Sequence, residues 1–177
     1  MRLKIGLVGC GAIGSEIAGS IDQGEISADL VAICDHNPAR TEELFKNLKA
    51  RPKKANLEEL VRLSDLVIEA ASQRAVPAIA KAALGSGKNL MIMSVGALAD
   101  AETYRSIKAL AQEHGSKIYI PSGAISGLDG LKSASVGKIR RVTLTTTKSP
   151  ASLEGAPYIK EKNIDLGSLK EPTTIFE

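Results

Sequence analysis

A run of glycines near the start of the chain has the spacing of a phosphate-binding loop. The run is Gly9-Cys10-Gly11-Ala12-Ile13-Gly14, and it separates an apolar segment from a helical pattern. In such a loop the first glycine permits a tight turn, the second lets the backbone approach a pyrophosphate, and the third lets the helix pack on the strand. Free N–H groups at the helix start then bind the phosphates. We therefore predict a dinucleotide site that includes Gly9, Gly11, Ala12, Ile13 and Gly14.

An acidic residue stands where a dinucleotide site needs one. Asp35 ends a second apolar segment, 21 residues after Gly14. Its carboxylate could accept hydrogen bonds from the ribose 2′- and 3′-hydroxyls, and it would repel a 2′-phosphate. Asp35 therefore favours NAD over NADP as the cofactor. His36 and Arg40 could weaken that preference, although both also suit exposed surface positions. The alternative for the whole pattern is a glycine turn that binds nothing.

Small residues follow two later predicted strands. Glu69-Ala70-Ala71-Ser72 ends one of them, and Ser94-Val95-Gly96-Ala97 ends the next. Ligands of open parallel sheets bind beyond the carboxyl ends of the strands. Ala70, Ala71 and Ser72 are therefore expected to leave room for a ribose and a nicotinamide. We interpret Glu69 as a supporting residue rather than a base.

No residue stands out as the catalytic acid or base that a dehydrogenase needs. The sequence contains two histidines. His36 lies beside the expected adenosine ribose, and His114 ends a helix on the side of the sheet remote from the strand ends. Lys148 is a weak candidate, and Asp129 suits either a substrate contact or a helix cap. The catalytic residue stays unknown, and no spacing suggests a metal site.

The elements that would position these residues alternate between strand and helix. Alternation of this kind predicts a parallel sheet covered on both faces, which is an α/β, Rossmann-type fold. Apolar runs predict strands at 3–8, 28–34, 65–70, 89–94 and 117–121. Helical patterns occupy 12–21, 38–49, 56–62, 73–84 and 101–114.

The pattern changes after Pro121. We predict a dinucleotide-binding domain at 1–121 and an incomplete α+β domain for substrate binding and dimerisation at 122–177. A Thr-rich alternation at 141–147 predicts an antiparallel, half-exposed strand, and 172–177 also resembles a strand. A segment this short cannot bury much core by itself. We therefore expect another part of the protein, or another subunit, to complete it.

Composition excludes several classes of protein. The chain has 177 residues, a net charge of +3, 44% hydrophobic residues and two cysteines. No apolar run reaches the length of a membrane span, and neither a basic patch nor an aromatic platform indicates nucleic-acid binding. The N-terminus lacks the pattern of a secretory signal. We expect a soluble protein of the cytoplasm with a small-molecule substrate, no nucleic acid and no membrane.

Taken together, several runs resemble the L-aspartate dehydrogenase family, in its archaeal and thermophile branch. They are the glycine loop, Glu69-Ala-Ala-Ser-Gln73 with Ala75-Val76, Ser94-x-Gly96-Ala97, Ile120-Pro-Ser-Gly-Ala-Ile-Ser-Gly-Leu-Asp129, the Thr-rich run 142–148 and the final Ile175-Phe-Glu177. The resemblance extends over essentially the whole chain, and its longer runs are more specific than the glycine loop.

The resemblance implies an oxidative deamination that uses NAD or NADP. L-aspartate would pass through iminoaspartate to oxaloacetate and ammonia, the imine would be available for NAD biosynthesis, and the enzyme would be a homodimer. Ala124 would contact the cofactor. Members of the family continue beyond Phe-Glu into a segment with the catalytic His, before which this chain is expected to end. The alternatives are an NAD(H)-binding module without catalysis and another two-domain oxidoreductase, related to homoserine dehydrogenase or dihydrodipicolinate reductase.

Overall fold

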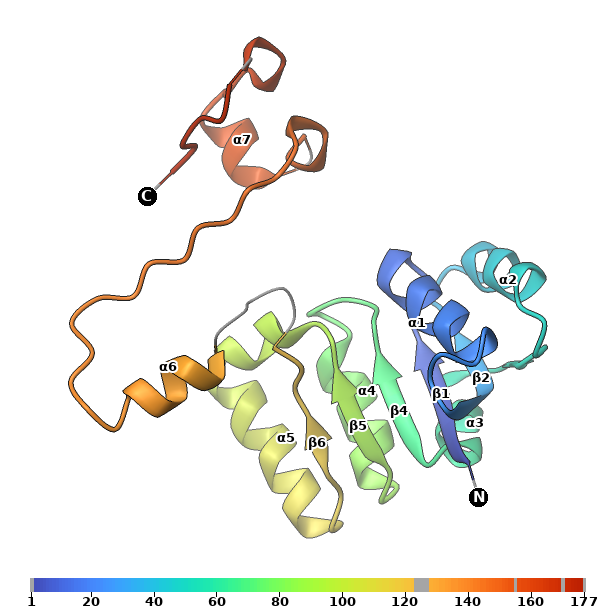
Figure 1. Cartoon of the computed structure of the whole chain (residues 1–177). Helices are drawn as coiled ribbons and strands as arrows, with labels where there is room; N and C mark the ends of the chain where they lie inside the picture. Colours follow the sequence, from blue (N-terminus) through green and yellow to red (C-terminus); the bar gives the residue numbers. More distant parts are fainter. Residues whose placement is uncertain (1, 123–127, 155, 170, 177) are drawn as a thin grey trace. The chain divides into compact units, whose positions relative to one another are not determined.

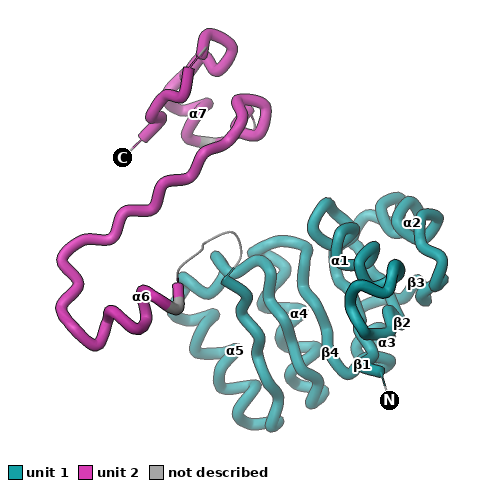
Figure 2. Tube along the Cα trace, in the orientation of Figure 1, with its two compact units in different colours: residues 1–126 teal, residues 127–177 magenta. Residues whose placement is uncertain are grey.

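The chain forms two compact units, Met1–Ser126 and Gly127–Glu177 (Figure 2). This computed structural model describes residues 2–122, 128–154, 156–169 and 171–176. In the first unit, six parallel strands form one sheet in the order β3-β2-β1-β4-β5-β6; β3 is labelled in Figure 2 and β5 and β6 in Figure 1. This is the strand order of doubly wound dinucleotide-binding folds. The strands are β1 (Leu3–Val8), β2 (Ala28–Cys34), β3 (Lys53–Lys54), β4 (Leu66–Glu69), β5 (Asn89–Ile92) and β6 (Ile118–Tyr119).

Five helices and one 3₁₀ turn connect the strands. They are α1 (Ala12–Asp22), α2 (Pro38–Asn47), α3 (Leu57–Leu63), α4 (Val76–Gly85), η1 (Val95–Ala99) and α5 (Ala101–Glu113). Local chemistry fixes where several begin. The Asn37 side chain accepts a hydrogen bond from the Ala39 N–H before α2, and Asn56 does the same for Glu59 before α3. Such caps satisfy backbone donors that a helix start leaves free.

Apolar side chains cover both faces of the sheet. In β4, Leu66 and Ile68 pack with α1 and α2, whereas Val67 points to the opposite face and packs with α3, α4 and α5. A strand buried on both faces reads as a continuous apolar run, which is why this sheet could be predicted from the sequence. The Rossmann-type fold is confirmed.

The first unit differs from the prediction in detail. The two-residue strand β3 was not predicted, because Lys53 and Lys54 are exposed and carry no apolar pattern. The predicted helix at 73–84 begins at Val76, after a turn. No helix among the residues that the structure describes combines the length and apolar character needed to cross a membrane.

The second unit contains only short helical elements within its described residues. They are α6 (Leu128–Ala134), η2 (Pro150–Ser152), α7 (Pro157–Glu161) and η3 (Leu166–Ser168). The prediction of a strand at 141–147 is wrong, and so is that of a strand at 172–176. Residues 138–149 form no regular element, and their side chains are exposed. A strand needs a neighbour to pair with its backbone, and residue pattern alone does not supply one.

Candidate functional site

The glycine loop joins β1 to α1 at the carboxyl edge of the sheet. Gly9 has a φ of 105°, and a Cβ there would overlap the carbonyl of Ala70. A Cβ on Gly14 would overlap the carbonyl oxygen of Gly9. The first and third glycines therefore let three segments pack closely: the loop, the helix and the end of β4. These are the structural roles that the spacing predicts.

Gly11 differs from its two neighbours in the motif. It has an ordinary extended backbone at the N-cap of α1, and a Cβ built on it would meet no heavy atom within 4 Å. The fold therefore does not need a glycine here. The space beside Gly11 opens in front of the first turn of α1, where Ala12 and Ile13 are exposed and backbone N–H groups lack partners in the helix. This cradle, which a Cβ would fill, fits a pyrophosphate.

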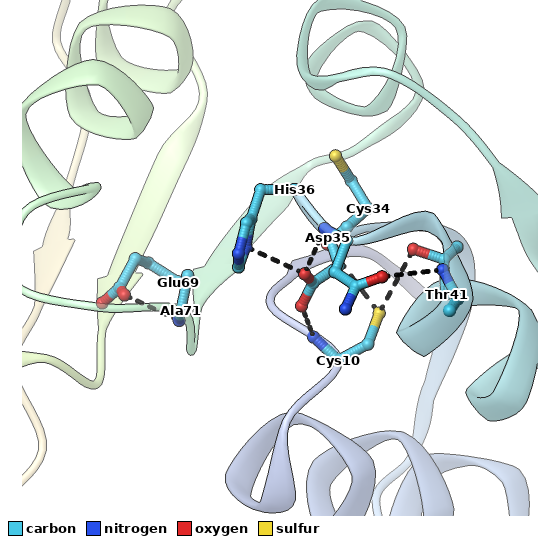
Figure 3. A network of polar contacts seen from close by, with 9 residues as sticks. Cys10, Cys34, Asp35, His36, Thr41, Glu69 and Ala71 are labelled. Carbon is cyan, nitrogen blue, oxygen red and sulfur yellow. Dashed lines mark hydrogen bonds and ion pairs between the residues drawn. The ribbon is translucent and has the colours of Figure 1, made fainter.

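Asp35 follows β2 and lies against the glycine loop (Figure 3). Its Oδ2 accepts a hydrogen bond from the Cys10 N–H at 2.8 Å, and its Oδ1 accepts one from the Asn37 N–H at 2.8 Å. The His36 Nδ1 lies 3.0 Å from the same Oδ1. Burial alone would raise the pKa of the carboxyl, but the two backbone bonds and the charges of His36 and Arg40 hold it below its ordinary value. Asp35 is therefore an anion held beside the glycine loop by a hydrogen bond from the Cys10 N–H.

Glu69 joins the carboxyl ends of β4 and β5. Its side chain is fully buried, and Oε1 accepts hydrogen bonds from the Ala71 N–H and the Ser94 hydroxyl, both at 2.8 Å. Oε2 accepts a third bond from the Ser94 N–H at 2.9 Å. Every bond goes to a neighbouring loop, so Glu69 has the supporting position that the sequence predicts for it. Figure 3 shows its carboxylate turned toward Ala71.

The two runs of small residues lie together at the edge of the sheet. Besides the Glu69 bonds, the Gln73 side chain packs against Gly96, where a Cβ would overlap its Nε2 atom. Ala70 is half-buried and bonds through its N–H to the Val8 carbonyl, whereas Ala71 and Ser72 are exposed. Ala70, Ala71 and Ser72 are thus brought next to Gly9, at the switch point between β1 and β4 where ligands of such sheets bind.

A cleft of about 480 Å³ lies between α1 and α2 and begins at the glycine loop. Gly11, Ala12 and Ser15 line one side, and Arg40, Glu43 and Asn47 line the other. Ser15, Glu43 and Asn47 were not predicted to lie in the site. The spacing of Arg40, Glu43 and Asn47 could have predicted them, because it puts three polar residues on one face of a helix.

The cysteines support the loop without being reactive. Cys10 is buried, with its Sγ 3.8 Å from the Cys34 carbonyl oxygen and 3.9 Å from the Thr41 hydroxyl. Burial raises the pKa of the Cys10 thiol to about 11, and it also raises that of Cys34. A thiol with a raised pKa is a poor nucleophile, because the thiolate is the reactive form.

Three candidates from the sequence remain: Ala124, His114 and Lys148. Ala124 lies outside the residues that the structure describes. His114 is the C-cap of α5, and Lys148 is exposed in the second unit. Across the described ranges, no three His, Cys, Asp or Glu side chains are grouped as they would be to hold a metal ion.

The sheet order, the glycine loop and Asp35 define a Rossmann-type nucleotide-binding domain of the dehydrogenase class. Comparison with family models agrees: residues 9–121 match the model described as "Homoserine dehydrogenase, NAD binding domain", and residues 129–177 match "Aspartate dehydrogenase, C-terminal". The first of these models matches more than half of the chain, so the chain belongs to the family with this NAD-binding domain, and its residues 129–177 are similar to the C-terminal domain of aspartate dehydrogenases.

Curated relatives are similar over almost all of this chain. It is 51% identical to the L-aspartate dehydrogenase of Methanosarcina acetivorans over 99% of its own length and 65% of that protein. It is 44% identical to the L-aspartate dehydrogenase of Methanococcus maripaludis, again over 99% of its own length and 65% of that protein. The chain thus spans 65% of the length of these relatives.

Solved structures support the fold. UDP-N-acetylglucosamine 3-dehydrogenase GnnA from Acidithiobacillus ferrooxidans superimposes with a TM-score of 0.64 at 22% identity, over 79% of this chain and 46% of that one. The WlbA dehydrogenase from Bordetella pertussis, solved with NADH and UDP-GlcNAcA, superimposes with a TM-score of 0.61 at 24% identity, over 77% of this chain and 42% of that one.

Proposed function

We propose that the protein is an NAD(P)-dependent L-aspartate dehydrogenase whose first unit binds the dinucleotide. The observation that carries the proposal is Gly11, a glycine that the fold does not require, at an open helix N-terminus beside a carboxylate. The reaction converts L-aspartate through iminoaspartate to oxaloacetate and ammonia. NAD, when bound, supplies the acceptor for the hydride.

The residues of the chain divide the work of binding. Ala12, Ile13 and Gly14 offer backbone N–H groups to the pyrophosphate at the start of α1. Asp35 accepts from the adenosine ribose, and Ala70, Ala71 and Ser72 border the nicotinamide half. Glu69 holds the loop at Ala71 in place, and it connects that loop to Ser94. Ala124 is proposed as a further cofactor contact. The proton-transferring residue is not assigned.

Replacing Gly11 by Ala tests the binding role. The substitution adds one methyl group to open space, so we expect a stability loss of no more than about 1 kcal/mol, because Ala is a poorer N-cap than Gly. NADH binding in a fluorescence titration should be at least about tenfold weaker. Gly85→Ala, at the end of α4, is the matched control: its Cβ would also meet no heavy atom within 4 Å, and it should bind NADH as the parent does. Unchanged affinity in Gly11→Ala would refute the pyrophosphate site.

The substrate is tested with the full-length product of the gene. We expect NADH formation with L-aspartate and NAD, measured by absorbance. Turnover of a different amino or hydroxy acid, and none of aspartate, would favour another two-domain oxidoreductase.

A second candidate function is an NAD(H)-binding module without catalysis. It is favoured by one observation: among the residues that the structure describes, neither histidine is placed to serve the nicotinamide half of the site. Tight NADH binding by the full-length protein without turnover of any tested substrate would support it.

We also propose that the protein works in the cytoplasm as a homodimer and that its product enters NAD biosynthesis. Family resemblance supports these three statements. Light scattering of the purified full-length protein tests the dimer, for which twice the subunit mass is expected.

A further inference from the structure

Gln73 and Gly96 lie at the end of the site that is remote from Asp35. Asp35 follows β2, the glycine loop follows β1, Gln73 follows β4 and Gly96 follows β5. These four strands are neighbours in the order β2-β1-β4-β5. A dinucleotide with its adenosine ribose at Asp35 and its pyrophosphate at the glycine loop therefore extends its nicotinamide end toward Gln73 and Gly96.

The Gln73 side chain packs against the backbone of Gly96, which belongs to η1. A Cβ built on Gly96 would overlap the Nε2 atom of Gln73 and would lie 2.9 Å from its Cδ atom. The φ of Gly96 is not positive, so its backbone conformation would accept other residues. The neighbouring amide, and not the backbone, is therefore the reason that a glycine suits this position.

The backbone on both sides of this contact is held by one buried carboxylate. Glu69 accepts hydrogen bonds from the Ala71 N–H at 2.8 Å and from the Ser94 N–H at 2.9 Å. Ala71 precedes Gln73 by two residues, and Ser94 precedes Gly96 by two residues. The loops after β4 and β5 are thus connected at Glu69, and the Gln73 amide lies between them at a position that the fold determines.

The amide itself has unused capacity for hydrogen bonding. Gln73 is exposed, and within the described part of the chain its side chain makes no hydrogen bond. A carboxamide offers two N–H donors and an acceptor oxygen. Of the neighbouring residues proposed to border the nicotinamide, Ala70 and Ala71 have no polar side-chain atom, and Ser72 has one hydroxyl. Gln73 is therefore the side chain in this loop that can both donate and accept across a planar amide.

We propose that Gln73 is a specificity-determining residue that binds the carboxamide of the nicotinamide ring, and that Gly96 leaves the room which the Gln73 side chain needs. This inference rests on the proposed dinucleotide site. Two carboxamides are complementary, because each N–H group can donate to the oxygen of the other. The pair would fix the rotation of the nicotinamide ring about its bond to the ribose, and with it the face of the ring that the substrate meets.

The test compares the binding of NAD, its 3-acetylpyridine analogue and ADP-ribose to the full-length protein by calorimetric titration. The analogue has a methyl group in place of the amide nitrogen of nicotinamide, and ADP-ribose lacks the ring. The parent protein should bind NAD about three- to tenfold more tightly than the analogue, the value of one hydrogen bond between neutral groups. In Gln73→Ala this preference should disappear, while the affinity for ADP-ribose stays that of the parent.

Two further substitutions separate the contact from a general effect on the loop. Gly96→Ala displaces only the end of the flexible Gln73 side chain, so it should remove the same preference with little loss of stability. Combining it with Gln73→Ala should change nothing more, since both act on one interaction. Gln112→Ala removes another exposed glutamine, on α5, and should keep the parent's preference.

Three results would overturn the inference while leaving the dinucleotide site intact. They are the same preference for NAD over the analogue in Gln73→Ala as in the parent, no preference in the parent, and an equal weakening of NAD and ADP-ribose binding in Gln73→Ala. Failure of the parent to bind both NAD and ADP-ribose would instead overturn the proposed function itself.

Discussion

The three glycines of one motif have different physical reasons to be glycine. Gly9 and Gly14 make room for neighbouring backbone, while Gly11 leaves space beside the loop. The spacing in the sequence predicts all three together and cannot tell them apart, because the distinction depends on β4, which is far away in the chain. Structural and ligand-binding effects should therefore separate on substitution.

Gly14→Ala should damage the fold as well as binding. The new Cβ would overlap the Gly9 carbonyl oxygen, so α1 must shift, at a cost of about 2–4 kcal/mol in the free energy of unfolding. Urea denaturation measures the loss. Gly19→Ala is the control on the same helix: its Cβ would meet only Gln23, at 3.9 Å, and a gain of about 0.5–1 kcal/mol is expected. Equal stability of the two variants would contradict the packing role of Gly14.

Asp35 should make the free energy of unfolding depend on pH in the acid range. Its pKa is lower in the folded protein than its ordinary value of 3.8, so the folded state binds fewer protons than the unfolded state in that range. The stabilisation is present at neutral pH and is lost as the pH falls below about 5. The stability difference between the parent and Asp35→Asn should shrink from pH 7 to pH 3 in urea titrations. A difference that stays constant over this range would show that the charge of Asp35 does not stabilise the fold.

At the scale of elements, the strand ends depend on one buried carboxylate. Glu69 receives three hydrogen bonds that connect the end of β4 to the start of η1. The sequence suggested a supporting role from residue type and position. It could not reveal Ser94 as the partner, because that contact follows from the pairing of β4 with β5.

Glu69→Ala should lower the free energy of unfolding by about 2–4 kcal/mol, since it removes the acceptor of three hydrogen bonds and empties the space of a fully buried side chain. Ser94→Ala removes only the hydroxyl bond and should cost about 1 kcal/mol. Chemical denaturation of both variants measures the effect, with the exposed Glu58→Ala as a control that should change stability little. A loss in Glu69→Ala no larger than in Glu58→Ala would rule out the connecting role.

Most elements of the first unit were predictable for local reasons. Asn37 and Asn56 mark helix starts, and the apolar runs mark strands with both faces covered. The cleft between α1 and α2 was not predictable, because it depends on how two helices pack. The prediction of a strand at 141–147 was wrong for a related reason. The alternation at Val142 and Leu144 indicates a segment that could pair as a strand, but it does not show whether a partner strand is present.

At the scale of the molecule, both apolar clusters lie within the first unit. Their buried members run from Ile5 to Ala111, so the sheet and its helices have a complete core of their own. We expect a chain of residues 1–126 to unfold cooperatively and to bind NADH with the affinity of the 177-residue chain within about threefold. Calorimetry and fluorescence titration measure the two properties. A broad unfolding transition, or a much larger loss of affinity, would show that residues after 126 contribute to the site.

The exposed segment at 138–149 also affects how copies of this chain meet. Its backbone is in no strand, and Val142 and Leu144 are 59% and 63% exposed. Such a stretch is a template on which another chain can add a strand. Lys138, Arg140, Arg141 and Lys148 act as gatekeepers, because like charges keep two such segments apart. Added salt screens this repulsion. Concentrated samples should therefore self-associate faster in high salt. The colloidal behaviour of the protein then depends on these four cationic side chains and on the two aliphatic side chains beside them.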